Sequence, residues 1–174
     1  MLEKILKIAG NVRGKEIGVL GLAFKPQTDD VRESVALDLI RALRRRGASV
    51  RAFDPVARET AAAEIGDPKV DYCGSAYEVA SGAEVLVIAT EWNEFRMLDL
   101  KKLRRIMKSP MVVDCRNIYD PLQMDELGFR YVGVGRGIPV RPKDGKQKKK
   151  ARTGAGPRGD GKRATARTKK KVAR

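Results

Sequence analysis

Histidine is absent from the 174 residues of this chain. Histidine is the side chain that most often serves as a general base near neutral pH, and it is also the commonest metal ligand. Its absence excludes chemistry that depends on a histidine base or on a histidine-ligated metal. We therefore expect no catalytic histidine dyad or triad, and no metal site.

Cysteine is almost as scarce, with only Cys73 and Cys115, which lie far apart and form no CxxC pair. This usage excludes a disulfide framework and is typical of a protein in the reducing cytoplasm. A thiol needs a neighbouring base or cation to act as a nucleophile. Without a histidine partner, we expect Cys115 to be a buried structural thiol and assign no catalytic residue.

Long apolar runs are also missing. No stretch approaches the length of a membrane-spanning helix, and the N-terminal residues lack the apolar segment of a signal peptide. We therefore expect a soluble cytoplasmic protein that makes no contact with a membrane.

Acidic residues are scarce in one part of the chain only. Residues 138–174 hold 15 of the 37 Lys and Arg but only Asp144 and Asp160 of the 22 acids, a net charge of +13. Residues 1–137 then carry 22 − 20 = +2. Large apolar residues almost vanish after Gly137, so residues 138–174 are predicted to be a disordered Lys/Arg-rich tail. Such a tail is either a non-specific contact for polyanions or a solubilising extension.

The remaining residues alternate between short apolar runs and amphipathic segments. This alternation predicts right-handed βαβ units and an α/β fold, namely a three-layer, Rossmann-like open parallel sheet of about six strands. A helix over residues 1–8 comes first, and we assign residues 1–13 to a linker and residues 14–137 to the domain. Strands are predicted at 16–22, 49–53, 70–73, 85–89, 111–113 and 130–132, with helices at 34–46, 57–65, 76–81, 100–107 and 121–127.

Ligands of open parallel sheets bind outside the carboxyl ends of the strands, and the first predicted strand ends in an unusually long loop. Gly18-x-x-Gly21 lacks the spacing of a G-x-G-x-x-G dinucleotide fingerprint, and Asp54-Pro55 after the second strand suggests a turn and helix cap instead. The loop offers Lys25 and Arg32, cations suited to phosphate oxygens. The alternative is a solvated loop whose own acids pair with these cations.

Two further strand ends carry polar residues. Residues 90–95 hold the only tryptophan, Trp92, and are best interpreted as an aromatic lid packed on the sheet edge. Arg116 follows the fifth strand and is a candidate anion clamp, with an ion pair to Asp114 or Asp120 as the alternative.

Four blocks together resemble the C-terminal domain of the UDP-glucose/GDP-mannose dehydrogenase family. They are GVLGLAFKPQTDDVRES at residues 18–34, AFDP at 52–55, TEWNEFR at 90–96 and VDCRNIYDP at 113–121. They occur in the family's order across residues 14–137. The TEWNEF form is most similar to the UDP-glucose branch.

The resemblance implies a UDP-sugar ligand and an NAD-dependent 6-dehydrogenase that oxidises UDP-glucose to UDP-glucuronate. Residue by residue, it implies that Phe24, Lys25 and Arg116 contact the sugar nucleotide. It also implies that Arg32 reaches the phosphates of NAD, which the family binds mainly through an N-terminal domain.

The family's catalytic cysteine, its assisting Lys and Asp, and its G-x-G-x-x-G have no counterpart in this sequence. The helix at residues 1–8 resembles the end of the linker from the family's dimerisation region. We therefore expect either a dehydrogenase fragment or subunit that needs a partner chain, or a stand-alone UDP-sugar-binding or regulatory module. A nucleic-acid-associated protein is a third possibility that only the tail supports.

Overall fold

The computed structural model describes residues 1–135, and the predicted tail at 138–174 lies outside the described residues. Six parallel strands form one sheet with the order β3-β2-β1-β4-β5-β6. The chain builds outward from β1 to one edge and then crosses over to build toward the other. The strand order therefore reverses between β1 and β4, and the loops that follow these two strands meet at the carboxyl edge of the sheet. The strands are β1 (Glu16–Leu20), β2 (Ser49–Phe53), β3 (Val70–Tyr72), β4 (Val85–Ile88), β5 (Met111–Asp114) and β6 (Arg130–Gly133).

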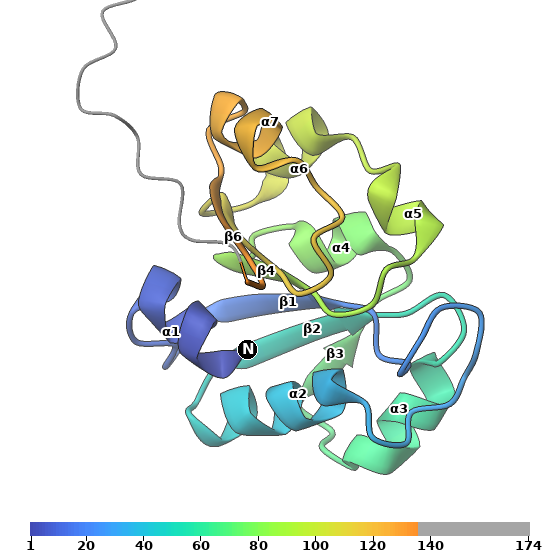
Figure 1. Cartoon of the computed structure of the whole chain (residues 1–174). Coiled ribbons are helices and arrows are strands. Elements are labelled where there is room, and N and C mark those ends of the chain that lie inside the picture. The colour runs from blue at the N-terminus through green and yellow to red at the C-terminus, as the bar shows by residue number, and fades with distance from the viewer. Residues whose placement is uncertain (136–174) are drawn as a thin grey trace, which may run out of the picture. The chain divides into compact units, whose positions relative to one another are not determined.

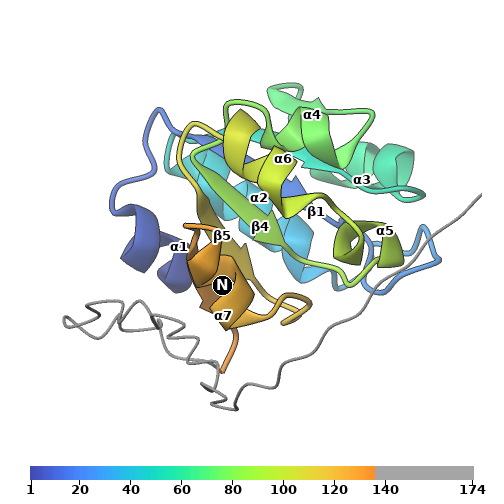
Figure 2. The same ribbon diagram turned by 90° about the horizontal axis from the view of Figure 1, so that it is seen from above.

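Helices cover both faces of this sheet, as Figure 1 shows and the view from above in Figure 2 repeats. The helices α1, α2 and α3 belong to one outer layer, and α4 to α7 belong to the other. Their bounds are α1 (Leu2–Ala9), α2 (Val35–Arg45), α3 (Arg58–Ile65), α4 (Ala76–Ala80), α5 (Asn93–Arg96), α6 (Leu100–Ile106) and α7 (Pro121–Glu126). The expected three-layer α/β architecture is confirmed.

The central strand β4 shows why the sheet needs two layers of helices. All four of its residues are buried, and they alternate between the two cores: Val85 and Val87 face the core under α1 to α3, while Leu86 and Ile88 face the core under α4 to α7. A strand buried on both faces is apolar throughout, as is typical of parallel sheets. The helix α1 joins the first core through Ile5 and Ile8.

The structure corrects the predicted elements mainly at their ends. The first strand stops at Leu20 instead of residue 22, because Gly21 adopts a positive φ of 90° and turns the chain out of the sheet. The short helix α5 was not predicted, since four residues are too few to show a helical period. Among the helices of residues 1–135, none combines the length and the apolar character that crossing a membrane requires.

Candidate functional site

The loop between β1 and α2 is folded back on itself at the carboxyl edge of the sheet. The hydroxyl of Ser34 donates a hydrogen bond to the carbonyl oxygen of Leu22 (2.6 Å), and the Phe24 N–H donates to the carbonyl oxygen of Asp30 (2.9 Å). These two bonds close the base of the loop and leave its tip in solvent. Phe24 is half exposed where the tip begins, and Lys25 beside it is exposed.

The carboxylate of Asp54, at the end of β2, connects three loops. Its Oδ1 accepts hydrogen bonds from the N–H groups of Val56 (3.0 Å) and Ala57 (2.9 Å), as expected for a turn before a helix. Its Oδ2 accepts from the N–H groups of Leu22 and Ala23 and from the indole Nε1 of Trp92. The turn was predicted, but the connections to the loops after β1 and β4 were not.

The loop after β4 is fixed against the loop after β1. Thr90 is fully buried, and its hydroxyl donates a hydrogen bond to the carbonyl oxygen of Ala23 (2.8 Å). Trp92 is partly buried, packs against the core beneath α4 to α7, and donates to Asp54. The interpretation of Trp92 as an aromatic packed at the sheet edge agrees with this placement.

Arg116, in the loop after β5, brings these segments together. Its Nε donates a hydrogen bond to the carbonyl oxygen of Ala89 (2.8 Å), and one terminal nitrogen donates to that of Phe24 (3.3 Å). Its ion pair is with Glu91, with Nε 2.9 Å from Oε2. The alternative prediction of an ion pair with Asp114 or Asp120 is therefore wrong.

Buried Asp114 supports the loop that carries Arg116. One carboxylate oxygen accepts the backbone N–H of Arg116 (3.0 Å), and the other accepts the N–H of Tyr119 and the hydroxyl of Tyr131. Burial raises the pKa of the Tyr119 hydroxyl well above its usual range, so this residue stays neutral. Asp114 therefore shapes the loop through hydrogen bonds to its backbone, while the Arg116 side chain points to the neighbouring strand ends.

The two predicted cations of the β1–α2 loop differ in their surroundings. Arg32 forms a two-pronged pair with Asp30, with Nε–Oδ1 at 3.0 Å and Nη2–Oδ2 at 2.8 Å, and this pair lowers the pKa of Asp30 to about 2. Within residues 1–135, Lys25 makes no hydrogen bond or ion pair. Arg32 therefore fits the alternative of a solvated loop whose own acids pair with its cations. Lys25 does not, and it remains available to an anion.

A shallow cavity of about 260 Å³ lies on this loop, lined by Phe24, Asp30, Arg32 and Glu33. Gln27 and Glu33 in the same loop adopt positive φ angles of 62° and 57°, and Asn117 beside Arg116 adopts 55°. Such conformations are unfavourable for residues other than glycine, and they concentrate where a site demands a particular backbone shape.

The two cysteines do not have the properties of a nucleophile. Burial raises the pKa of the Cys115 thiol to about 11 and also raises the pKa of Cys73. A thiol with a raised pKa carries little of the reactive thiolate at neutral pH. No group of three metal-ligating side chains occurs within the part of the chain that the structure describes.

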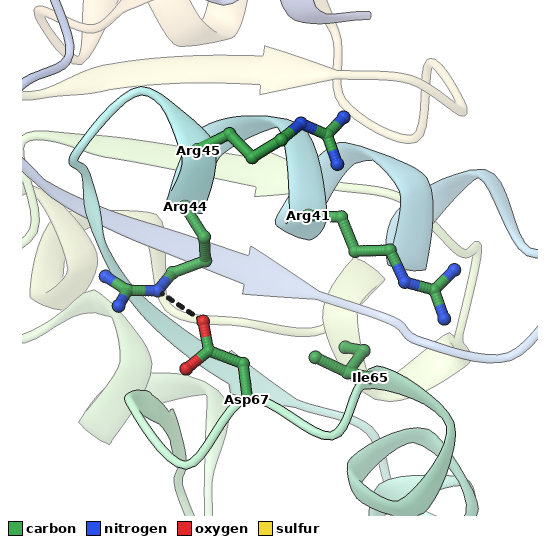
Figure 3. Close-up of a pocket in the computed structure, with 5 residues that line it drawn as sticks. All are labelled: Arg41, Arg44, Arg45, Ile65 and Asp67. Atoms are coloured by element: carbon green, nitrogen blue, oxygen red, sulfur yellow. Dashed lines mark hydrogen bonds and ion pairs between the residues drawn. The ribbon is translucent and has the colours of Figure 1, made fainter.

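Another hollow, of about 330 Å³, lies between α2 and the end of α3 and is lined by Arg41, Arg44, Arg45, Ile65 and Asp67 (Figure 3). Two of its arginines are already engaged. Arg44 pairs with Asp67 (2.9 Å), and Arg41 donates to both the carboxylate and the carbonyl oxygen of Glu64. These contacts attach α2 to α3, which accounts for Arg41 and Arg44 without a ligand.

Comparison with known proteins decides the family. Residues 18–121 match the model of the UDP-glucose/GDP-mannose dehydrogenase family, UDP binding domain. The chain belongs to this family. The matched range contains every loop described above, and so the resemblance inferred from the sequence blocks is confirmed.

Named relatives support this family assignment. The chain is 46% identical to the UDP-glucose 6-dehydrogenase of Rhizobium meliloti over 137 residues, which are 78% of this chain and 31% of that protein. It is 46% identical over 133 residues to the enzyme of the same name from Pseudomonas aeruginosa, with 73% and 29% covered. Among solved structures, the UDP-glucose dehydrogenase of Pyrobaculum islandicum matches with a TM-score of 0.65 and 38% identity, over 76% of this chain and 28% of that one.

The chain thus spans about 30% of the length of the curated relatives that it matches. Two site features of this UDP binding domain escaped the sequence analysis: Glu91 as the partner of Arg116, and Asp54 as the link between three loops. The first depends on β4 lying beside β5, and the second depends on β1 lying between β2 and β4. The linear sequence does not display this strand order.

Proposed function

We propose that this chain binds the nucleotide half of a UDP-sugar, UDP-glucose or UDP-glucuronate, as part of an NAD-dependent UDP-glucose 6-dehydrogenase. Phe24, Lys25 and Arg116 would contact this ligand. The observation that carries the proposal is the position of Arg116, whose guanidinium joins the ends of β1, β4 and β5 beside exposed Lys25. A guanidinium held in this way is suited to a diphosphate, because its remaining N–H groups point in fixed directions.

The described residues do not form a complete binding site for NAD. The turn after β1 lacks G-x-G-x-x-G, and Asp54, the acid at the end of β2 where a ribose would be held, is only 2% exposed and occupied by five N–H donors. Arg32 is paired with Asp30, but 87% of its side chain is exposed, and it is the cation that we assign to the phosphates of NAD held elsewhere. Residues 1–135 therefore contribute one contact to the cofactor, and the dehydrogenase chemistry requires a partner chain or further domains.

The decisive experiment is calorimetric titration of the purified chain with UDP, UDP-glucose and NAD separately. We expect weak binding of the two uridine ligands and none of NAD, because half of a closed site is missing. Arg116→Ala should weaken UDP binding by roughly 1–3 kcal/mol, and Lys25→Ala should weaken it less. Lys69→Ala is the matched control. Lys69 is an exposed lysine at the amino end of β3, away from the carboxyl ends of the strands. Unchanged UDP affinity in both site variants would remove the assignment.

A stand-alone UDP-sugar-binding or regulatory module is the second candidate function, and the net charge of +13 in residues 138–174 is what favours it. A dehydrogenase subunit should co-purify with a chain that carries an NAD fingerprint. A stand-alone module should bind UDP with micromolar affinity by itself, without such a partner.

A further inference from the structure

Glu91 has a carboxylate oxygen that is buried but receives no hydrogen bond. Oε2 lies 2.9 Å from Nε of Arg116, but that N–H points to the carbonyl oxygen of Ala89, so the contact is an ion pair without a hydrogen bond. A buried acceptor without a donor costs free energy. The neighbouring Thr90 is fully buried and bonded to Ala23, so the backbone beside Glu91 is held in place.

A second oxygen that accepts no hydrogen bond belongs to the same edge of the sheet. Oδ1 of Asn117, the residue after Arg116, is also buried without a hydrogen bond, although its amide nitrogen donates to the carbonyl oxygen of Val134. The loops after β4 and β5 thus combine one guanidinium with two oxygens that lack donors. Phosphate oxygens would satisfy the guanidinium, but they accept hydrogen bonds and do not supply the missing donors.

A ligand that satisfies both kinds of group carries anionic phosphates and hydroxyl groups together. We propose that Glu91 is a specificity-determining residue that accepts a hydrogen bond from a sugar hydroxyl of the nucleotide sugar, while Arg116 binds its diphosphate. This inference rests on the proposed function. Because the carboxylate of Glu91 repels phosphate, the Arg116–Glu91 pair disfavours anions without hydroxyl groups and favours anions that carry them. The hydroxyl belongs either to the ribose or to the hexose, and the two are separable by experiment.

The test is a double-mutant cycle between protein and ligand, measured by calorimetry. UDP, 2′,3′-dideoxy-UDP and UDP-glucose are titrated into the wild-type chain and into Glu91→Ala, Glu91→Gln and Glu94→Ala. Comparing UDP with its dideoxy form tests the ribose, and comparing UDP-glucose with UDP tests the hexose. Glu94→Ala removes an exposed carboxylate from the same segment and serves as the control. Thermal melting of each variant confirms that it is folded.

We expect one of the two hydroxyl-bearing ligands to bind the wild-type chain and Glu94→Ala about tenfold better than its comparison ligand. This preference should shrink to less than about twofold in Glu91→Ala and lie between these values in Glu91→Gln, which keeps an acceptor oxygen but loses the charge. Equal preferences in the wild type and Glu91→Ala would overturn the role of Glu91 and leave the UDP site intact. Failure of the wild-type chain to bind any uridine ligand would overturn the proposed function, and the role of Glu91 with it.

Discussion

At the scale of single residues, Asp54 determines how the candidate site is held together. Its two carboxylate oxygens accept five N–H donors from the loops after β1, β2 and β4, and the residue is almost fully buried. These five N–H donors replace the hydration that burial removes from the carboxylate. Loss of this one side chain would leave donors of three loops unpaired at once.

We therefore expect Asp54→Ala to lower the free energy of unfolding by about 3–5 kcal/mol. Trp92→Phe removes only the indole donor and should cost the hydrogen bond, about 1 kcal/mol, plus a small packing loss. Urea denaturation of both variants measures the difference. A cost below about 1 kcal/mol for Asp54→Ala would show that solvent satisfies these donors and that the three loops do not depend on the carboxylate.

At the scale of elements, the residues just after β1 and β4 lie in close contact. A Cβ atom built on Gly21 would lie 2.5 Å from Cβ and 2.6 Å from the backbone nitrogen of Thr90, and the φ angle of Gly21 is 90°. Both the space and the backbone conformation therefore require glycine at this position. This contact sets the start of the β1–α2 loop.

Gly21→Ala should destabilise the chain by at least about 2 kcal/mol, because the backbone of Thr90, just after β4, cannot move aside without disturbing the sheet. Gly66→Ala is the matched control: Gly66 also has a positive φ, 63°, but nothing lies within 4 Å of an added Cβ, so only the backbone cost of about 1 kcal/mol applies. The midpoints of denaturant unfolding measure the difference in stability between the two variants. Equal costs would mean that the contact with Thr90 relaxes freely.

The sequence predicted the elements better than it predicted the contacts between them. The apolar run after residue 84 and the amphipathic stripe of α2 are local patterns, and the structure places β4 and α2 within one or two residues of the predicted bounds. The partner of Arg116 was predicted among acids nearby in the chain. It is instead Glu91, because β4 pairs with β5 and brings the two loops together. Side-chain pairing between loops follows strand order, which local periodicity does not encode.

At the scale of the whole molecule, the described residues contain neither a complete NAD site nor an activated thiol. We expect no NADH production from UDP-glucose and NAD by the purified chain. The first oxidation needs bound NAD, and the turn after β1 lacks the G-x-G-x-x-G that would bind it. Covalent catalysis of the second oxidation needs an activated thiolate, whereas burial raises the pKa of both Cys73 and Cys115. The NADH absorbance assay, with the Pseudomonas aeruginosa enzyme as positive control, measures this. Steady turnover by a preparation free of host enzyme would contradict it.

Most of the net positive charge of the molecule lies in residues 138–174. Their basic residues are spaced by Gly, Ala, Thr and Pro without an apolar stripe, so attraction to a polyanion would come from counterion release alone. We expect the full chain to bind DNA with an affinity that falls steeply between about 50 and about 200 mM salt and depends little on base sequence. A chain ending at Gly137, whose net charge is +2, should lose this binding while keeping its affinity for UDP. Equal DNA binding by the two chains would assign the contact to the folded domain. No measurable DNA binding by the full chain at low salt would leave the tail as a solubilising extension.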